Sequence, residues 1–229
     1  MELANPQPRT YSLIRELNSN SSEWKIKVRV SRLWDVESKS KKGFKICTDM
    51  VLIDEEGGYI HSTIPGGTKL RQKLVEGNIY IIKYFDITDN KDQYRVVSDT
   101  IQEDGDIIPR HRFDFVAFHD LDRRRENFSV LSDVVGAFVD NFSTPEEPKI
   151  EIQDKCGQKV IVKLWGKCIT DYHEQRRLLG EENNSFIVTI TSILVKDYRG
   201  FLSLATSPAS KLYINLDIDE VNELKIVLM

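Results

Sequence analysis

Residues 154–165, DKCGQKVIVKLW, read as the turn and the return strand of a β-hairpin. Gly157 suits the turn, and the aliphatic residues after it recur at every second position, which predicts a strand with one buried face. Residues 54–65, DEEGGYIHSTIP, have the same layout at a constant offset of 100 residues, with Gly57 in the turn. The two hairpins therefore predict an internal repeat.

The same order of elements surrounds each hairpin. In the first half, period-2 alternation predicts strands at 24–34, 44–54, 59–64, 79–87 and 93–98, with a short helix within 65–78. In the second half it predicts strands at 133–142, 149–153, 159–165, 185–195 and 201–206, with a short helix within 168–183. Five strands with a helix between the third and the fourth form the order of the OB-fold, a five-stranded Greek-key barrel.

The predicted class is therefore mainly β, with two tandem OB-folds. We place the first at 8–118, a linker at 119–128, and the second at 129–229, ending in a helix over DIDEVNELK. Two unrelated α+β domains are the alternative architecture.

Composition excludes several classes of protein. The 229 residues are 40% hydrophobic with a net charge of −4, which is ordinary for a globular chain. There is no apolar run of about 18 residues, so no membrane span is expected, and the first residues lack the pattern of a secretory signal. Three cysteines without a C-x-x-C predict neither a disulfide framework nor a zinc ribbon.

Neither catalysis nor a cofactor is expected. The common motifs of nucleotide hydrolases, serine hydrolases and zinc proteases are missing. Cys156, Cys168 and His173 lack a clear fourth metal ligand, so no metal is expected. The glycine pair in IPGGTKL, residues 64–70, suggests either a phosphate cradle or a plain strand-to-helix loop.

Basic residues are concentrated near the start of the chain. The segment from Trp24 to Lys45 contains eight basic residues and only two acidic ones, Asp35 and Glu37. The basic residues are Lys25, Lys27, Arg29, Arg32, Lys39, Lys41, Lys42 and Lys45. A local basic groove is therefore compatible with the acidic total, and a groove of this kind can follow a nucleic-acid backbone.

Two aromatic residues are candidates for stacking on bases. Alternation places Trp165 on the side of Lys163, opposite the aliphatic core face, although a tryptophan covering a barrel end is the alternative. Tyr198 is expected at a hairpin tip between Lys196 and Arg199, where it either clamps a strand of nucleic acid or is simply solvated. Trp24 and Trp34 are expected mainly in the core.

Several motifs resemble one known family. KVIVKLWGKCITDY, VKDYRGFLSL and LDIDEVNEL resemble the second DNA-binding OB-fold of the replication protein A large subunit. WKIKVRVSRLW, MVLIDEEGGYIHSTI, LVEGNIYIIKYF and FDFVAF are similar to its plant-expanded relatives. The resemblance covers residues 11–224 approximately, and LWG after a glycine turn is its most specific motif.

The resemblance implies particular functional residues. The stacking aromatics of the second fold fall on Trp165 and Tyr198, whereas those of the first fall near Thr48 and Ile82, which cannot stack. The loop at 39–42 matches a loop of the first fold that closes over DNA in the family. The acidic run at 146–148 occupies the corresponding loop of the second fold.

The expected function is largely sequence-independent binding of single-stranded DNA in replication, repair or recombination. The expected nucleic-acid-binding residues are Trp165, Tyr198, Lys163, Lys196, Arg199, Lys39, Lys41, Lys42, Lys45 and Arg32. RNA is a second possible ligand, other replication protein A-type subunits are expected partners, and the family implies a nuclear location. The alternative is an OB-fold adaptor that binds proteins and has lost most nucleic-acid binding.

Overall fold

The structure is a computed structural model. It describes residues 9–21, 23–38, 40–41, 43–88, 93–103, 108–127, 131–144, 148–180, 182–198 and 200–228. The chain divides into two compact units, Met1–Arg112 and Phe113–Met229. Each unit is described by itself.

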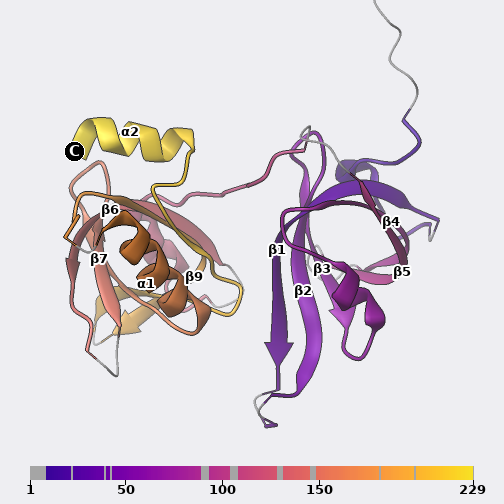
Figure 1. The fold of residues 1–229 in the computed structure, drawn as a ribbon, viewed down its shortest axis with the longest axis horizontal. Helices are drawn as coiled ribbons and strands as arrows, with labels where there is room; N and C mark the ends of the chain where they lie inside the picture. Colours follow the sequence, from indigo (N-terminus) through magenta and orange to yellow (C-terminus); the bar gives the residue numbers. More distant parts are fainter. Residues whose placement is uncertain are drawn as a thin grey trace, which may run out of the picture. The chain divides into compact units, whose positions relative to one another are not determined.

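The first unit is a closed five-stranded barrel (Figure 1). Its elements are η1 (Ile14–Glu16), β1 (Lys25–Glu37), β2 (Lys45–Ile53), β3 (Tyr59–Pro65), η2 (Lys69–Lys73), β4 (Ile79–Thr88) and β5 (Gln93–Glu103), where η marks a 3₁₀ helix. The strand order is β1-β2-β3-β5-β4, and β4 pairs with β1 to complete the ring. The helix predicted between the third and fourth strands is the short 3₁₀ helix η2.

Alternating side chains of the strands fill the first barrel. Ile26 and Val28 of β1 point inward with Met50 and Leu52 of β2, and all four are fully buried or nearly so. Arg29, one of the basic residues counted toward the predicted basic groove, is buried. It is 5% exposed, and its guanidinium donates to the carbonyl oxygens of Ile108 and Gly77, so it closes the barrel instead of lining a groove.

The second unit repeats this plan. Its elements are η3 (Phe118–Arg124), β6 (Ser132–Asn141), β7 (Lys149–Gln153), β8 (Lys159–Lys163), α1 (Lys167–Leu179), β9 (Ile187–Tyr198), β10 (Phe201–Ala205), β11 (Leu212–Ile214) and α2 (Asp219–Leu228). The sheet order is β10-β8-β7-β6-β9-β11, and pairing of β10 with β9 closes the ring. The structure thus has the predicted class, two OB-type barrels with a C-terminal helix.

Two features of the second unit differ from the prediction. The stretch expected as a linker, 119–128, contains most of η3, whose Phe118 and Leu121 are buried in the core of this unit. The strand β11, which the sequence pattern does not predict, pairs with the first half of β9. No helix among the described residues combines the length and the apolar character that a membrane crossing requires.

The hairpin turn of each unit is organised by one aspartate. Asp54 Oδ1 accepts the backbone N–H groups of Glu56 and Gly58 at 3.1 and 2.8 Å. Asp154 Oδ1 accepts those of Cys156 and Gln158, both at 2.9 Å. The glycine between them has a φ of +78° at Gly57 and +83° at Gly157, a conformation that other residues rarely adopt.

We expect truncation of these aspartates to destabilise the protein by different amounts. Asp154→Ala leaves two turn N–H groups without their acceptor, which should lower the free energy of unfolding by about 1–3 kcal/mol. Asp54→Ala should cost more, because Asp54 Oδ2 also accepts the buried N–H of Ile14 at 2.8 Å. Urea unfolding followed by circular dichroism measures both, and the corresponding asparagine variants, which keep Oδ1, are the controls. An equal loss in the two alanine variants would contradict this account.

Candidate nucleic-acid interface

Four strands of the second unit share an outer face. The pairing registers place Lys149 of β7 beside Lys163 of β8, and Lys163 beside Ala205 of β10. On the other side of β10, Ser203 is paired with Lys196 of β9. Because side chains alternate along a strand, these residues point away from the core that Val160, Val162 and Leu204 help to fill. We call this surface of β7, β8, β10 and β9, with the adjoining Trp165, the outer face.

Trp165 lies at the end of the outer face, directly after β8. Its side chain is 50% exposed, whereas the preceding Leu164 is fully buried. The backbone N–H of Trp165 donates to Thr206 Oγ1 at 2.8 Å, which fixes its position against the end of β10. Lys163 Nζ lies 4.6 Å from the centre of the indole ring. Trp165 therefore lies at the surface, not in the core.

A second pair of aromatic residues lies at the β9–β10 hairpin. Tyr198 and Phe201 are paired directly across the two strands and are 62% and 75% exposed. Sequence reasoning selected Tyr198 and missed Phe201. The signal was present in the alternation GFLSL, because the inward positions of Leu202 and Leu204 leave Phe201 on the outer face.

The β9–β10 hairpin is fixed next to its turn by Asp197. Its Oδ1 accepts the N–H of Gly200 at 2.9 Å, and Arg125 pairs with its other oxygen. The backbone hydrogen bond from Gly200, and then Arg125, hold the pKa of Asp197 below its usual value. Arg125 also pairs with Asp122 of η3, so the hairpin is attached to the body of the unit.

Cations are interspersed with the aromatic residues of the outer face. Lys196 is exposed on β9, and Lys163 and Lys149 are half-buried on neighbouring strands. Glu151 of β7 pairs with Lys159 of β8 at 3.4 Å, which neutralises that carboxylate. Arg199, also predicted to bind, lies outside the described residues.

The corresponding face of the first unit has different chemistry. Trp34 of β1 stacks on His61 of β3 with ring centres 5.5 Å apart. Asp49 of β2 lies beside them, 3.4 Å from His61 Nε2, and accepts the Thr63 hydroxyl at 2.8 Å. Burial would raise the pKa of Asp49, but hydrogen bonds from His61 and Thr63 lower it. The family-derived stacking positions, Thr48 and Ile82, are both buried. A carboxylate thus occupies the middle of this face.

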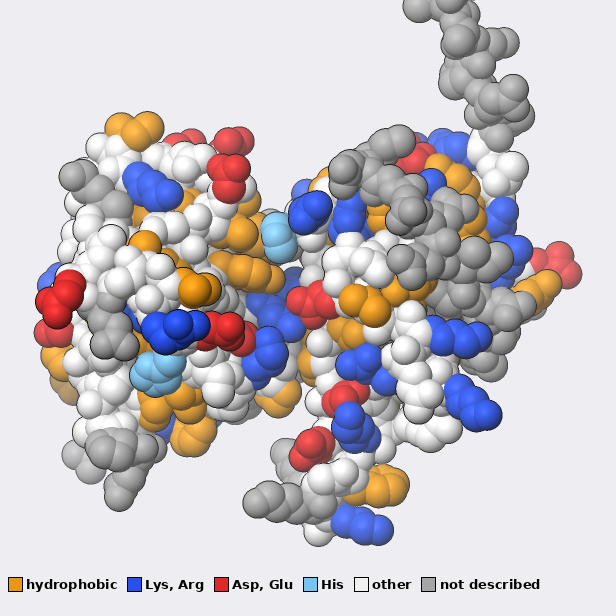
Figure 2. Space-filling model, viewed as in Figure 1, with side chains coloured by type: hydrophobic (Ala, Val, Ile, Leu, Met, Phe, Trp, Pro, Cys, Tyr) orange, Lys and Arg blue, Asp and Glu red, His pale blue; other side chains and the backbone are white. Residues whose placement is uncertain are grey.

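The basic loop of the first unit joins β1 to β2. Figure 2 shows basic and hydrophobic side chains together at the end of this hairpin. Lys41 is exposed, with its Nζ 5.2 Å from the centre of the Phe44 ring, and Phe44 is itself 53% exposed. Lys45 is exposed but pairs with Asp35. Lys39 and Lys42 lie outside the described residues, and Arg32 is half-buried on β1.

Asp35 connects this loop to η2. Its carboxylate accepts hydrogen bonds from Lys45, from the Thr48 hydroxyl at 2.7 Å and from Arg71 at 3.2 Å. Burial would raise the pKa of Asp35, but these hydrogen bonds outweigh it and lower the pKa to about 2. Asp35 therefore fixes the base of the loop at neutral pH.

The other candidate sites of the sequence have structural explanations. A Cβ at Gly66 would lie 2.4 Å from the carbonyl oxygen of Ile46, so close backbone packing accounts for this glycine of the suggested phosphate cradle. Cys168 is buried, with its Sγ 3.5 Å from the Ser210 carbonyl oxygen, whereas Cys156 and His173 are exposed. Among the described residues, no group of three or more His, Cys, Asp or Glu side chains is arranged to hold a metal.

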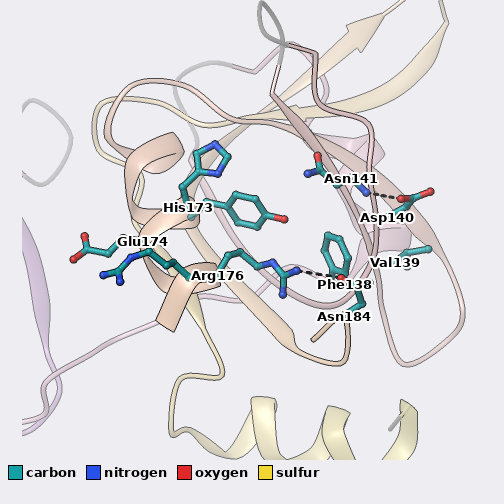
Figure 3. Close-up of a pocket in the computed structure, with 10 residues that line it drawn as sticks. Phe138, Val139, Asp140, Asn141, His173, Glu174, Arg176 and Asn184 are labelled. Atoms are coloured by element: carbon teal, nitrogen blue, oxygen red, sulfur yellow. Dashed lines mark hydrogen bonds between the residues drawn. The ribbon is translucent and has the colours of Figure 1, made fainter. Parts of the chain in front are cut away.

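A hollow of about 680 Å³ lies between α1 and the end of β6 (Figure 3). Arg176 of α1 crosses it, lying 4.6 Å from the Phe186 ring centre and 5.8 Å from that of Phe138. Its guanidinium also donates to the Asn184 side-chain oxygen at 3.1 Å. Arg176 is therefore engaged in holding this wall together, and the exposed aromatic residues of the outer face make the better candidate interface.

Comparison with known proteins confirms the resemblance. Residues 15–102 match the family described as domain of unknown function DUF223. One replication protein A 70 kDa DNA-binding subunit of Arabidopsis thaliana is 25% identical over 244 residues, covering 96% of this chain and 28% of that protein. Another 70 kDa DNA-binding subunit from the same plant is 23% identical, covering 93% of this chain and 30% of that protein. The chain thus spans less than a third of the length of these curated relatives.

A solved structure shows the same fold. A replication protein A heterotrimer bound to single-stranded DNA matches with a TM-score of 0.60 at 20% identity, covering 93% of this chain and 54% of the matched chain. This likeness shows that the two barrels of this chain are OB-folds.

We expect the contribution of Asp35 to stability to depend on pH. Because the pKa of Asp35 is lower in the folded state, its contribution is present above about pH 4 and is lost as the pH falls from 3.8 towards 2. Asp35→Asn should lower the free energy of unfolding at pH 7 by about 1–2 kcal/mol, a value discounted for partial exposure. Glu37→Gln, which removes an exposed carboxylate from the same strand, is the control. A difference in the free energy of unfolding between Asp35→Asn and the unaltered protein that is the same at pH 7 and at pH 2 would contradict this prediction.

Proposed function

We propose that this chain binds single-stranded nucleic acid, principally DNA and largely without sequence preference, on the outer face of the second unit. The observation that carries the proposal is the exposure of Trp165, Tyr198 and Phe201, at 50, 62 and 75%, on a face that also presents Lys163 and Lys196. Aromatic rings of this kind stack on bases whatever their identity, because every base has a π-face.

The geometry favours single strands over duplexes. A base in a duplex is already stacked on its neighbours and does not offer a free face to a tryptophan, whereas an unpaired base does. Lysines between the rings neutralise the phosphates that join successive bases. Stacking alone does not read the 2′-hydroxyl, so RNA is included as a competing ligand of the same face.

The relatives support the same proposal. Two curated relatives are named as DNA-binding subunits, and the matched solved structure holds single-stranded DNA. Because the chain spans less than a third of those relatives, a role in replication, repair or recombination, association with other replication protein A-type subunits and a nuclear location belong to the proposal. Binding without catalysis is the activity that we propose.

The first unit contributes mainly charge in this proposal. Asp49 occupies the middle of its face, where it repels phosphate, and Trp34 is already stacked on His61. The basic loop at 39–42 is then the part of the first unit that contacts the strand, through phosphate and not through bases.

A binding titration tests the proposed function. Fluorescence anisotropy with a labelled oligothymidine of about 15–20 nucleotides should show saturable binding at low salt. An oligouridine of equal length and a duplex of the same length should be measured beside it. Absence of binding at high micromolar protein and low salt would overturn the proposal.

We expect Trp165→Ala and Phe201→Ala each to weaken binding by about 1–3 kcal/mol, the value of one stacked base, which is about 5- to 150-fold in affinity. Because both side chains are exposed, the melting temperature should change little. Trp165→Phe keeps a stacking ring and should retain most of the affinity, and Tyr59→Ala removes a 50% exposed ring in the first unit as a matched control. A large loss of stability with unchanged affinity would show that Trp165 has a structural role only.

Salt dependence tests the basic loop. Replacing Lys39, Lys41 and Lys42 with alanine should flatten the slope of log K against log salt by about 0.7 for each phosphate that the loop no longer neutralises. The double variant Lys155→Ala with Lys225→Ala, outside the loop, should leave the slope unchanged. An unaltered slope in the loop variant would show that these lysines are only solvated.

A further inference from the structure

The second unit contains an apolar pocket away from the outer face. It has a volume of about 500 Å³ and lies between α2 and the segment 115–119, with Val135 of β6 also lining it. The turn of the β7–β8 hairpin, including Asp154, closes one end. On the α2 wall, Ile226 and Val227 are 85% and 59% exposed. Exposed aliphatic side chains beside an apolar hollow are typical of an interaction site.

Asp154 gives the pocket an open hydrogen-bond acceptor. The residue is only 8% exposed, and its Oδ1 is occupied by the two N–H groups of the hairpin turn. Its Oδ2 accepts no hydrogen bond from the described residues. Oδ2 remains within reach of solvent, so a ligand N–H that replaces water there keeps the oxygen hydrogen-bonded while the apolar walls of the pocket are covered.

The internal repeat shows what the equivalent carboxylate binds in the first unit. Asp54 Oδ2 accepts the backbone N–H of Ile14 at 2.8 Å. Ile14 and the preceding Leu13 are 9% and 0% exposed, so the segment carrying them is packed in place. Arg9 and Arg15, on either side, pair with glutamates of the same hairpin turn. The first unit thus fills this position with its own basic and aliphatic segment.

The second unit has the corresponding segment in a different conformation. In the second unit the Val116 N–H donates to the carbonyl oxygen of Asp133 at 2.9 Å. The equivalent bond in the first unit runs from the Ser12 N–H to the carbonyl oxygen of Lys25 at 2.8 Å. The chain then enters the longer helix η3, and no N–H of the described residues 113–127 reaches Asp154. The helix α2 forms the opposite wall, so a pocket remains where the first unit is filled.

We propose that this pocket binds a short peptide segment of a partner protein, consisting of two adjacent aliphatic residues flanked by arginine. A backbone N–H of the peptide donates to Asp154 Oδ2, and its aliphatic side chains pack on Val135 and Val227. Its arginine pairs with Glu220 or Glu223 of α2. The site is independent of the proposed nucleic-acid interface.

Charge complementarity selects a basic peptide. The pocket is lined by three carboxylates, those of Asp154, Glu220 and Glu223, against one lysine, Lys155. An acidic peptide would therefore be repelled, and a purely aliphatic one would leave the carboxylates without a partner.

The first test uses the chain's own segment as a probe. A fluorescein-labelled peptide Arg-Thr-Tyr-Ser-Leu-Ile-Arg, which copies residues 9–15, should bind the intact protein saturably below about 1 mM by anisotropy. The same peptide with both arginines replaced by glutamate should not bind. Absence of saturable binding of the basic peptide would overturn the proposal.

Variants show whether binding occurs in this pocket. Asp154→Asn keeps the turn acceptor but replaces Oδ2 with a donor, and should weaken peptide binding about tenfold. Glu220→Gln with Glu223→Gln should weaken it as well. Glu220→Gln alone should weaken it less, and Glu174→Gln, which also removes one carboxylate but from α1, should not. Ala117→Trp, which fills the pocket from an exposed position, serves if Asp154→Asn proves unstable in a thermal melt.

Two further outcomes would overturn the proposal. Equal peptide affinity in all variants would place the peptide elsewhere. Self-association without peptide that Asp154→Asn or Ala117→Trp abolishes would assign the pocket to a second copy of this chain. Oligothymidine binding should be the same in the pocket variants and the unaltered protein, so failure of this proposal is distinguishable from failure of the proposed function.

Discussion

The carboxylate of Asp154 fixes the register of the β7–β8 hairpin, and the outer face depends on that register. With Oδ1 holding the N–H groups of Cys156 and Gln158, the return strand begins at one defined residue. Because the side-chain period of a strand is two residues, a slip of one position would bury Lys163 and expose Val162. The same slip would turn Trp165 into the barrel. One buried hydrogen-bond acceptor thus decides which chemistry the second unit presents to its surroundings.

The same turn in the first unit supports a different surface. Asp54 holds the β2–β3 hairpin in the equivalent register, so the outward positions of that face are equally well defined. They are occupied by Asp49, His61 and Thr63, which bond to one another and leave little for a base or a phosphate. The repeat has therefore kept the scaffold in both units while the surface chemistry has diverged, with aromatic rings in one and a bonded carboxylate in the other.

Strong local patterns made much of the fold predictable. Alternation and glycine turns were enough for the hairpins, and Trp165 was placed on the exposed side because Val160, Val162 and Leu164 fill the core. The alternation of β1 does not predict the burial of Arg29, because its guanidinium is covered through hydrogen bonds to the carbonyl oxygens of Gly77 and Ile108, which are distant in the sequence. The sequence pattern does not distinguish η3 from a linker, because only Phe118 and Leu121 anchor an otherwise polar stretch. Contacts of this kind between distant residues leave no periodic signal in the sequence.

The lysine above Trp165 connects stacking to charge on the outer face. Lys163 Nζ lies 4.6 Å from the indole ring centre, where a base would otherwise stack. At an exposed site this cation–π contact is worth about 0.5–1 kcal/mol, whereas a stacked base contributes about 1–3 kcal/mol. Replacement of the ammonium by a base would therefore be favourable in the complex that we propose, and the displaced ammonium would remain close to the phosphates. In the structure the lysine covers part of an exposed tryptophan. In the proposed complex it would neutralise a phosphate of the bound strand. The lysine–indole contact is thus weaker than the base stacking that we propose would replace it.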